Sequence, residues 1–477
     1  MRIFTDQEKK LAFYGFLFVG LYLYFFFFSL VVLRCLPFIR ELYLVKMVAV
    51  EMGRWTPAVF LVLLGLVYYV VAKKFSSQHI SRQSVPVVLF FAVIFHLLLL
   101  LSFPTLSADI TGYIARSTIV TEHHQNPYRV TPDEVDPSLY TNWSDTKMAY
   151  GPLWTLIGSY TRIFSGDQGA NFFIFKLVTV AFSAGCAVLV YGIVRRLKPG
   201  RERLALLLYL WNPLILVETV GSGHNDVVLA FFLLLAVYCA VSGRRLLSFV
   251  ALALSALVKY VTVVAVPFFL LLYWWQGGKR SERAVFSLKG AFIMVVTAVA
   301  VVFPFWGDGF LEGIFQHSQS LGGTLLFGGI ANTLAYFIIV ILMGSPFDSA
   351  AVHSVVSNAN AAFLAVALMV LLSVYLYRQK KSYVDCIAML LLVLFAIAVL
   401  SPFFFQPWYY VWGLGLLIVW GAVVRDGRYL TLAALASFAG LFTYTIFSIV
   451  SILIGIALFT MERLSGDVKG FFKQLRA

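Results

Sequence analysis

Apolar runs of about 17 to 25 residues recur along most of the chain, and they restrict its fold more than any other feature. A helix needs about 20 such residues to cross about 30 Å of hydrocarbon, whereas the alternating pattern of a barrel strand is not seen. Charged residues make up 12% of the sequence, about half their usual share in a soluble domain. We therefore predict an all-α polytopic membrane protein, a single integral membrane domain over residues 1–477, with about 11 to 13 transmembrane helices.

The basic residues indicate which way the helices run. The formal net charge is +14, but Lys and Arg come in short clusters between apolar runs, such as Lys73-Lys74 and Arg195-Arg196. Such clusters hold loops on the cytoplasmic side of a membrane, so we expect no nucleic-acid partner. Alternating the spans from the first one assigns the polar stretch of residues 105–170 to the extracytoplasmic face.

Other patterns argue against processing signals and metal sites. The apolar run 11–36 is longer than the roughly 7 to 15 residues of a cleavable signal peptide, so we expect it to remain as a membrane anchor. The cysteines lie singly within apolar runs, without the spacing of a metal site or a disulfide framework. The acids form no metal-ligand cluster either, so we expect no metal and no cofactor. The cysteines, expected to be small core residues, are Cys35, Cys186, Cys239 and Cys386.

Two apolar stretches carry signs of a break at membrane depth. Pro213 follows Trp211 and Asn212, and proline removes a backbone donor that must be compensated inside a bilayer. The stretch 246–275 has basic residues at both ends and Lys259 in its middle, which indicates two short helices that meet at a break. Between residues 307 and 378 the alternation of spans closes only with a re-entrant element.

Asp109 opens the long polar stretch, directly after the third apolar run. A carboxylate at a membrane surface costs free energy, and such residues are often functional. The spacing of Ile110, Ile114 and Ile119 predicts a helix over 107–122 that turns these side chains toward lipid or protein. In the structural alternative, Asp109 only caps this helix.

A second polar cluster, residues 221–226, reads Gly-Ser-Gly-His-Asn-Asp at the predicted outer end of a span. Glycines let backbone amides approach a ligand, and a helix N-terminus attracts anions, but Asn225 or Asp226 could also merely cap the next span. Lys259 is a cation within an apolar run, where an unpaired ammonium is expensive. Pairing with an acid or a phosphate is favoured over extension to a lipid headgroup.

Aromatic residues gather in two motifs, Tyr150 with Trp154 in Tyr-Gly-Pro-Leu-Trp, and Trp408 with Tyr409 in Gln-Pro-Trp-Tyr-Tyr-Val-Trp. An aromatic belt at the membrane interface is the simpler interpretation of the second motif. A platform for a sugar or an isoprenoid chain is the functional one. Motifs of nucleotide binding, serine hydrolases and zinc proteases do not occur in the sequence.

Together these motifs resemble a known superfamily. Asp109 after an early span is followed by Asn-Pro-Tyr, Tyr-Gly-Pro-Leu-Trp, Trp-Asn-Pro-Leu, Gly-His-Asn-Asp, a mid-membrane lysine and Pro-Trp-Tyr-x-x-Trp. From Ser107 to Trp412 the chain resembles the GT-C superfamily of integral membrane glycosyltransferases, in particular bacterial polyprenyl-phosphomannose-dependent α-mannosyltransferases. The resemblance implies a GT-C type bundle whose large extracytoplasmic first loop carries interfacial helices and the catalytic Asp109.

The resemblance further implies a membrane glycosyltransferase that moves a hexose, mannose above all, from a polyprenyl-phosphate sugar donor to a glycan or glycolipid acceptor. We expect it to act at the extracytoplasmic face of the bacterial plasma membrane, among membrane lipids. As a mechanistic hypothesis, Asp109 is the general base of a single displacement with inversion. Many relatives carry an acidic pair where Ile110 follows Asp109 here, so a second acid would be Glu122, Asp133 or Asp226. The expected donor and phosphate ligands are Lys259, Arg116, His224, Asn225 and Asp226, and the expected stacking residues are Tyr150, Trp154, Trp408 and Tyr409.

Two other functional classes remain open. A lipid or sugar transporter or flippase would also show many spans, a broken helix and a buried lysine. An undecaprenyl-pyrophosphate-dependent glycan polymerase or ligase is the third class, which the small number of arginines in the outer loop disfavours. The long outer loop and the lack of an inverted repeat in the hydropathy pattern favour the transferase.

Overall fold

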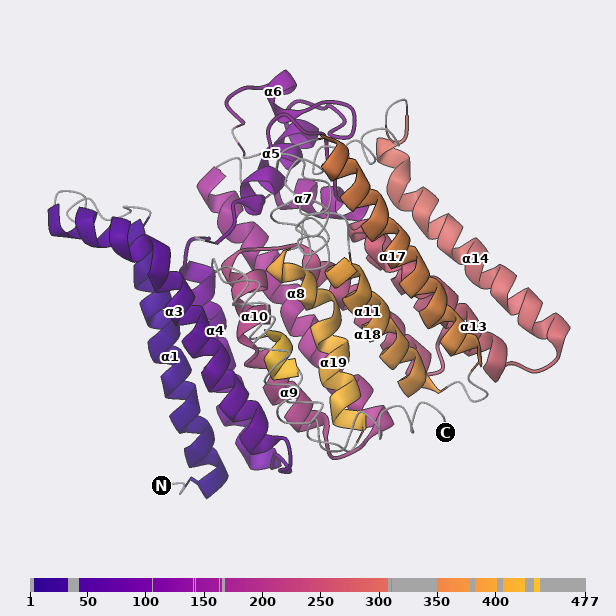
Figure 1. Cartoon of the computed structure of the whole chain (residues 1–477), viewed down its shortest axis with the longest axis horizontal. Helices are drawn as coiled ribbons and strands as arrows, with labels where there is room; N and C mark the ends of the chain where they lie inside the picture. Colours follow the sequence, from indigo (N-terminus) through magenta and orange to yellow (C-terminus); the bar gives the residue numbers. More distant parts are fainter. Residues whose placement is uncertain are drawn as a thin grey trace.

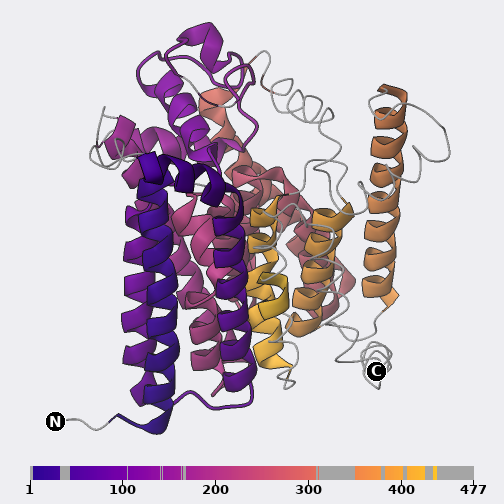
Figure 2. The same ribbon diagram turned by 60° about the vertical axis from the view of Figure 1, so that its left-hand side comes forward.

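The computed structural model describes residues 4–32, 43–104, 106–139, 141, 143–162, 164, 168–307, 310, 350–377, 382–400, 406–424 and 433–437. These residues form helices and turns, and no strand occurs among them, which confirms the predicted all-α class. The helices lie side by side in a bundle (Figure 1) with two distinct ends (Figure 2). The loop end carries the segment that begins at Ser102, and the basic end carries the N-terminus with Lys73 and Lys74.

Three long helices form the N-terminal side of the bundle (Figure 1): α1 (Asp6–Val32), α3 (Tyr43–Phe75) and α4 (Val85–Leu101). Trp211, from a more central segment, reaches the interface of α1 and α4, with ring centroids 6.0 Å from Phe18 and 5.9 Å from Phe91. Its indole nitrogen donates to Val88 O at 3.0 Å. Edge-to-face aromatic packing therefore ties this side of the bundle to the centre.

The loop end carries three short helices, α5 (Asp109–Thr121), α6 (Pro132–Val135) and α7 (Pro152–Arg162). The helix predicted over 107–122 is confirmed by α5. Ile110 and Ile119 are fully buried and Ile114 is nearly so, hence this face of α5 packs on protein and not on lipid. The first residue of α5 is thus held on a helix that is itself fixed by core packing.

The centre of the bundle is formed by α8 (Gln168–Leu197), α9 (Glu202–Leu210), α10 (Pro213–Ile215), a π-helix (Leu216–Gly221), α11 (Asp226–Val241) and α19 (Val411–Val423). The predicted break at Trp211-Asn212-Pro213 is confirmed, because the segments on its two sides meet at 44°. The Asn212 side chain accepts from Ile215 N at 3.1 Å and donates to the Tyr68 hydroxyl at 3.2 Å. These bonds satisfy polar groups at a proline break inside an apolar bundle.

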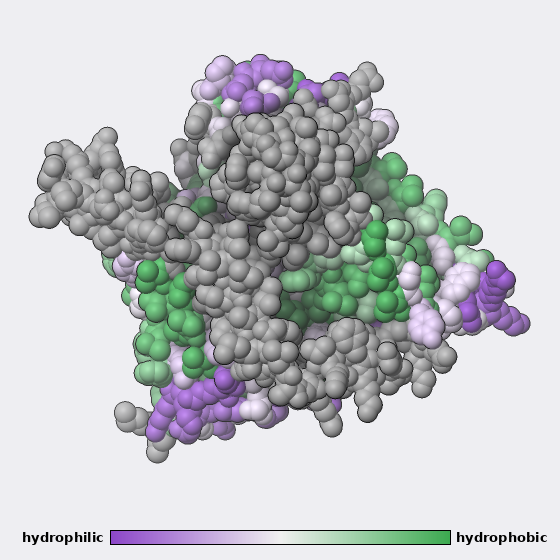
Figure 3. All heavy atoms as spheres, viewed as in Figure 1, coloured by the Kyte–Doolittle hydropathy of each residue, from purple (hydrophilic) through white to green (hydrophobic). Residues whose placement is uncertain are grey.

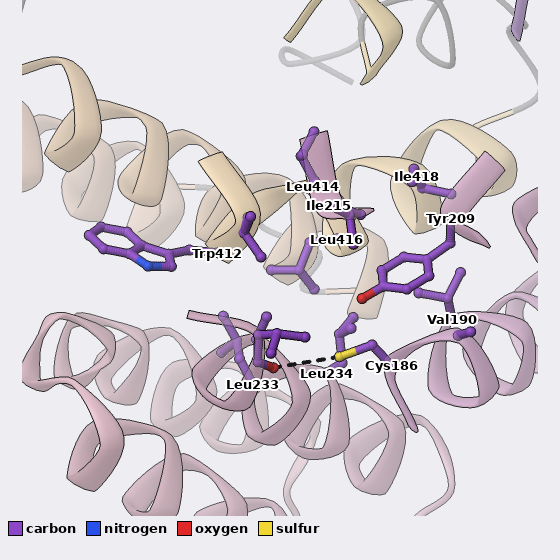
Figure 4. Close-up of a cluster of buried hydrophobic side chains, with 14 of the residues drawn as sticks. Cys186, Val190, Tyr209, Ile215, Leu233, Leu234, Trp412, Leu414, Leu416 and Ile418 are labelled. Atoms are coloured by element: carbon purple, nitrogen blue, oxygen red, sulfur yellow. Dashed lines mark hydrogen bonds between the residues drawn. The ribbon is translucent and has the colours of Figure 1, made fainter. Parts of the chain in front are cut away.

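Figure 4 shows the apolar core between these central helices, where the buried residues drawn include Cys186 of α8 and Leu233 and Leu234 of α11. The Cys186 thiol lies 3.7 Å from Val227 O, as a weak donor. Three of the cysteines are buried and free, which confirms their predicted place in the core, and Cys35 lies outside the described residues. The buried, free cysteines are Cys186, Cys239 and Cys386.

The remaining described helices are α12 (Arg245–Val258), α13 (Val266–Gln276), α14 (Arg280–Val302), α17 (Ala350–Tyr377) and α18 (Tyr383–Leu400). The break predicted within 246–275 is confirmed: α12 ends at Val258, Lys259 has an extended backbone, and a 3₁₀ turn (Tyr260–Ala265) leads into α13. Lys259 is therefore the residue at which an apolar helix ends, and its backbone is not helical.

The surface between the two ends is that of a membrane protein. Four described helices are long and apolar enough to cross a bilayer, and the bent pair Glu202–Leu210 and Pro213–Gly221 makes a fifth. Figure 3 shows apolar surface, in green, between hydrophilic groups at the loop end and at the basic end. The total of about 11 to 13 spans stays a prediction, since residues 311–349 and 438–477 lie outside the described ranges.

Candidate active site

Asp109 is the first residue of α5 and lies at the loop end of the bundle. Its Oδ2 accepts a hydrogen bond from the Tyr150 hydroxyl at 3.2 Å, and its backbone nitrogen donates to Ser107 Oγ at 3.2 Å. The N-cap of α5 is Ala108, which makes no side-chain capping bond. Asp109 is therefore not the N-cap residue, although it is the acid in the first turn of α5, and its carboxylate accepts a hydrogen bond from a tyrosine.

The surroundings of Asp109 shift the pKa of its carboxyl group. Burial raises the pKa of this carboxyl group above its usual value of 3.8, and the charge of Asp226 adds to the rise. The charge of Lys259 and the hydrogen bond from Tyr150 oppose it. Because a general base works best with a pKa near the operating pH, this environment suits Asp109 for proton transfer.

His224 lies beside Asp109, in the connector of residues 222–225 between the π-helix and α11. Its Nδ1 is 3.7 Å from Asp109 Oδ2, and its Nε2 is 3.5 Å from Glu218 Oε2. Trp408 stacks on the imidazole, with ring centroids 3.8 Å apart and planes at 22°. The imidazole is fully buried, so a carboxyl group faces each of its nitrogens out of contact with solvent.

Asp226 and Lys259 form an ion pair next to this group. Lys259 Nζ donates to Asp226 Oδ1 at 2.8 Å, and the Trp412 indole nitrogen donates to the same oxygen. Asp226 is fully buried, whereas 16% of the Lys259 side chain is exposed. The predicted pairing of Lys259 with an acid is confirmed, and Asp226 is the acid.

Aromatic rings enclose the ammonium group. Lys259 Nζ lies 4.9 Å from the ring centroid of Tyr409, 5.3 Å from that of Tyr150 and 5.4 Å from that of Trp412. Ring faces attract a cation most strongly where water is scarce. Trp154 is not part of this enclosure, because it is buried edge-to-face against Tyr113 at 5.1 Å and supports the site from behind.

Two loop motifs hold Tyr150 in place. Gly151 N donates to Val258 O at 2.9 Å, and a Cβ at Gly151 would lie 2.0 Å from Leu257 O, so glycine alone fits this approach. The Tyr128 hydroxyl, from the Asn-Pro-Tyr motif, donates to Tyr150 O at 2.8 Å. The segment that carries Tyr128 and Tyr150 is therefore joined to the end of α12, one residue before Lys259.

Arg116 is buried on α5, and its guanidinium is directed to the segment of residues 143–146. Nη2 donates to Trp143 O and Thr146 O, both at 2.8 Å, and Nη1 donates to Gly112 O at 3.2 Å. Oxygen acceptors of the chain itself thus surround the guanidinium. The structure does not bring Arg116 into contact with Lys259, and its predicted phosphate role stays a prediction.

Several buried polar atoms of the site make no hydrogen bond within the described part of the chain: both ring nitrogens of His224, both amide atoms of Asn225 and Oδ2 of Asp226. Asn225 occupies the N-cap position of α11, as in the capping alternative, but its side chain makes no capping bond. Buried polar groups are normally hydrogen-bonded, so this cluster is suited to a polar ligand. Within the described ranges, no group of three His, Cys, Asp or Glu side chains could hold a metal ion.

The three options for a second acid differ in their surroundings. Glu122 is half-exposed and pairs with Arg162, and Asp133 is exposed on the outer loop. Asp226 is the one of the three whose charge acts on Asp109.

Sequence reasoning missed two buried ionisable residues, Glu218 and Lys176. Glu218 faces His224 from the π-helix. Lys176 Nζ donates to Leu99 O at 2.6 Å and to Ser102 O, at the C-terminal end of α4. Both residues interrupt apolar runs, and an ionisable residue inside such a run is the signal that could have found them.

Comparison with known proteins points in one direction. A family model described as α-(1→6)-mannopyranosyltransferase, N-terminal domain, matches residues 30–275. The α-(1→6)-mannopyranosyltransferase A of Mycobacterium tuberculosis is 25% identical over 369 residues, which cover 72% of this chain and 66% of that protein. The α-(1→6)-mannopyranosyltransferase A of Corynebacterium glutamicum is 22% identical over 340 residues, covering 65% and 66% respectively. The chain thus spans just under two thirds of the length of these curated relatives.

Among solved structures, the crystal structure of the Archaeoglobus fulgidus oligosaccharyltransferase with Zn and sulfate is similar over 78% of this chain and 51% of that one, with 12% identity and a TM-score of 0.35. The family match covers more than half of the present chain and includes Asp109, the cluster 221–226 and Lys259. The resemblance predicted from the motifs is confirmed: the chain belongs to the α-(1→6)-mannopyranosyltransferase family.

Proposed function

We propose that this chain is an integral membrane mannosyltransferase that moves mannose from a polyprenyl-phosphate donor to a glycan or lipid-linked acceptor, with inversion. The observation that carries the proposal is the position of Tyr150, whose hydroxyl donates to Asp109 at 3.2 Å while its ring lies 5.3 Å from the Lys259 ammonium. Asp109, the proposed proton acceptor, and Lys259, the proposed phosphate ligand, therefore lie on either side of Tyr150. These are the two groups that sugar transfer from a lipid phosphate requires.

Asp109 is the proposed general base. The acceptor hydroxyl oxygen attacks the anomeric carbon on the face opposite the phosphate, and its proton passes to the Asp109 carboxylate. The bond between the anomeric carbon and the phosphate oxygen breaks, and its electron pair leaves with the polyprenyl phosphate. One displacement of this kind inverts the configuration at the anomeric carbon, and its products are a glycoside and the free lipid phosphate.

Lys259 is the proposed phosphate ligand. An ammonium group carries three N–H donors, of which Asp226 engages one through the 2.8 Å contact. The leaving phosphate gains negative charge in the transition state, and a fixed cation in a low-dielectric site stabilises it there. Asn225, whose buried amide atoms make no hydrogen bond in the described part of the chain, is the proposed additional ligand. His224 is not assigned to the phosphate, because a carboxyl group faces each of its ring nitrogens.

The aromatic side chains are assigned by their distance from this centre. Tyr150, Tyr409 and Trp408 lie against Lys259 or His224, so we assign them to contact with the sugar or the first isoprenoid unit. Trp154 packs behind Tyr113 and is assigned a supporting role. For Arg116 we favour a structural role over the predicted phosphate role, because its guanidinium donates to carbonyl oxygens of the loop.

The proposed face is the extracytoplasmic one. Lys73, Lys74, Arg195 and Arg196 lie at the end of α3 and α8 opposite to the site, and clusters of basic residues favour the cytoplasmic side. The site at the loop end then opens toward the outside of the plasma membrane. A lipid-linked donor reaches this level by its headgroup, and the acceptor arrives from the aqueous side.

Transfer can be tested directly with purified protein, polyprenyl-phosphate [³H]mannose and a mannan acceptor. The expected result is label in the acceptor together with an equal amount of free polyprenyl phosphate, and loss of both with Asp109→Asn. Movement of intact labelled donor across proteoliposome membranes without release of lipid phosphate would instead identify a flippase. A parallel assay with the glucosyl donor tests the choice of hexose.

A further inference from the structure

Glu218, His224 and Asp109 form a line of three side chains that ends at the proposed base; Glu218 and His224 are fully buried, and 16% of the Asp109 side chain is exposed. His224 Nε2 is 3.5 Å from Glu218 Oε2, and His224 Nδ1 is 3.7 Å from Asp109 Oδ2. Hydrogen bonds between catalytic groups are often long in a ligand-free enzyme and shorten when the substrate is bound. The two nitrogens of His224 are therefore placed to form hydrogen bonds with Glu218 and Asp109 when a substrate is bound, although each distance is slightly longer than a hydrogen bond here.

The local backbone creates this line. Residues Leu216–Gly221 form a π-helix, in which Ser222 N donates to Val217 O at 2.8 Å, five residues back. His224 N donates to Glu218 O at 3.1 Å, so the connector folds back over the π-helix. Single π-helical turns inside helical segments are frequent at functional sites.

Gly223 brings the connector close to α5. Its φ is +75°, a conformation that other residues rarely adopt, and a Cβ there would lie 2.8 Å from Ile110 Cδ1. The connector can thus approach the first turn of α5 closely. As a result, the His224 ring is held between the π-helix and Asp109, and Trp408 covers its face.

Charge restricts how these three groups can be protonated. Burial, and secondly the charge of Lys259, lower the pKa of His224 well below its usual value, which favours the neutral imidazole. A neutral imidazole has one N–H donor and one acceptor nitrogen, so it cannot donate to both carboxyl groups. Glu218 has no exposed surface, and the carboxylic acid is the less costly form of a carboxyl group in such a place.

We propose that Glu218 and His224 are positioning residues for Asp109: Glu218, as a carboxylic acid, donates to His224 Nε2 and thereby fixes the imidazole tautomer whose Nδ1–H faces the Asp109 carboxylate. In this arrangement the line carries one negative charge, on the base. The inference rests on the proposed function in the role it gives to Asp109, and it adds two residues that orient this base.

Two pairs of substitutions separate the proposed hydrogen bonds from general packing. Glu218→Gln keeps an N–H donor toward Nε2, whereas Glu218→Leu removes it. His224→Asn keeps an amide nitrogen near the position of Nδ1, toward Asp109, whereas His224→Gln extends its amide toward the Nε2 side. Both His224 variants lose the stack on Trp408 equally, so each is the control for the other.

The measurement is kcat/KM for mannose transfer as a function of pH. We expect Glu218→Leu to lose about 10- to 100-fold more activity than Glu218→Gln, and His224→Gln about 10- to 100-fold more than His224→Asn, the value of one hydrogen bond to a charged group. Loss of the donor destabilises the Asp109 carboxylate, so the acidic limb of the profile moves up by about one pH unit in Glu218→Leu and His224→Gln. The other titratable or charged groups that face Asp109, all unchanged in these variants, are Tyr113, Arg116, Tyr150, Asp226, Lys259 and Tyr409.

A second readout needs no substrate. In each background, the melting temperature of the protein with Asp109 is compared with that of its Asp109→Asn version across pH, and the step between the two curves reports the titration of Asp109. This step is expected to move to higher pH in Glu218→Leu and His224→Gln and to stay in place in their partners. It separates the present inference from the transfer reaction, because it can be measured even if the parent protein transfers no mannose.

Each other outcome overturns the assignment. Equal losses in Glu218→Gln and Glu218→Leu would mean that Glu218 acts as a carboxylate beside an imidazolium. A loss of rate without movement of the acidic limb or of the stability step would mean that these residues only support the fold. Unchanged activity in all four variants would remove both residues from the site.

Discussion

The backbone nitrogen of Gly151 donates a hydrogen bond of 2.9 Å to Val258 O, and this bond joins the segment that carries Tyr150 to the end of α12. On one side it fixes Tyr150, which holds Asp109. On the other side it precedes Lys259, which holds Asp226. The proposed base and the proposed phosphate ligand thus come from segments more than a hundred residues apart, and a single pair of backbone groups sets their separation.

Gly151→Ala should therefore impair the site more than its small change in volume implies. The new Cβ would lie 2.0 Å from Leu257 O, and relief of that overlap must shift either Tyr150 or Lys259. Forcing an extra methyl group into a packed site costs about 1–3 kcal/mol, so the melting temperature in detergent should fall together with transfer. Gly20→Ala on α1, where nothing lies within 4 Å of the new Cβ, is the matched control and should melt at or above the parent temperature.

Asp109→Asn should abolish transfer while the fold becomes slightly more stable. Loss of a general base lowers the rate by about 10² to 10⁴. Because the folded protein raises the pKa of this carboxyl group, its ionisation opposes folding, so the amide should melt at a higher temperature at neutral pH. Asp145→Asn, an exposed position of the same loop, should change neither quantity. Near-parental turnover in Asp109→Asn would eliminate Asp109 as the base.

The pH dependence follows from the same shift. Asp109 must be ionised to accept a proton, so kcat/KM should fall as the pH is lowered through its raised pKa, above the usual 3.8. The stabilisation that comes from the protonated form is complete below 3.8 and is lost as the pH rises through the raised value. A pH–rate profile and melting curves on one preparation should therefore show the two changes over the same pH range. An acidic limb at or below 3.8 would contradict the assignment.

Lys259 and Asp226 should show strong coupling in a double-mutant cycle. Removal of one partner leaves an uncompensated buried charge, and such changes cost about 3–5 kcal/mol. Lys259→Met and Asp226→Asn should each lower the melting temperature, and the double variant should lose less than the sum of the two. Donor binding should weaken in both variants that lack the lysine. Donor affinity that is unchanged by Lys259→Met would leave the pair a purely structural role.

Arg116→Lys tests whether this residue orders the loop or binds phosphate. Lysine cannot reproduce the planar donors that reach Trp143 O and Thr146 O, so the segment around residues 143–147 should be cleaved faster by trypsin. Affinity for a non-transferable donor analogue should change little. Arg129→Lys, exposed on the same loop, is the control. Weaker donor binding with unchanged cleavage would restore the phosphate role.

The periodicity of apolar residues and the positions of prolines predict much of the fold. The breaks at Asn212-Pro213 and at Lys259 were predictable because a missing backbone donor and an intramembrane charge each need compensation. The packing of α5 on protein rather than lipid was not, since Ile110 and Ile114 are compatible with both surroundings. Which of the two an apolar face meets depends on tertiary contacts that the sequence pattern does not contain.

The candidate site was predictable to a similar degree. Asp109, His224 and Lys259 were found because polar residues are rare in such a chain, and the structure brings them together. The partners were harder: Asp226 was one acid among three options, and Glu218 was overlooked within an apolar run. Trp154 was predicted to stack on the ligand, but it packs on Tyr113. The sequence does not distinguish a tryptophan that contacts a ligand from one that supports a neighbouring ring.

Lys176 gives the segment before Asp109 a fixed starting point. Through its bonds to Leu99 O and Ser102 O it fastens the last turn of α4 to α8, and Asp109 follows only seven residues after Ser102. Because Gly151 is fixed as well, the backbone at Asp109 has little freedom to move, and the carboxylate can change position chiefly by rotation about its own side-chain bonds. In the proposed reaction, acceptors of different length would therefore be accommodated by movement of the glycan, while the proposed base keeps its place.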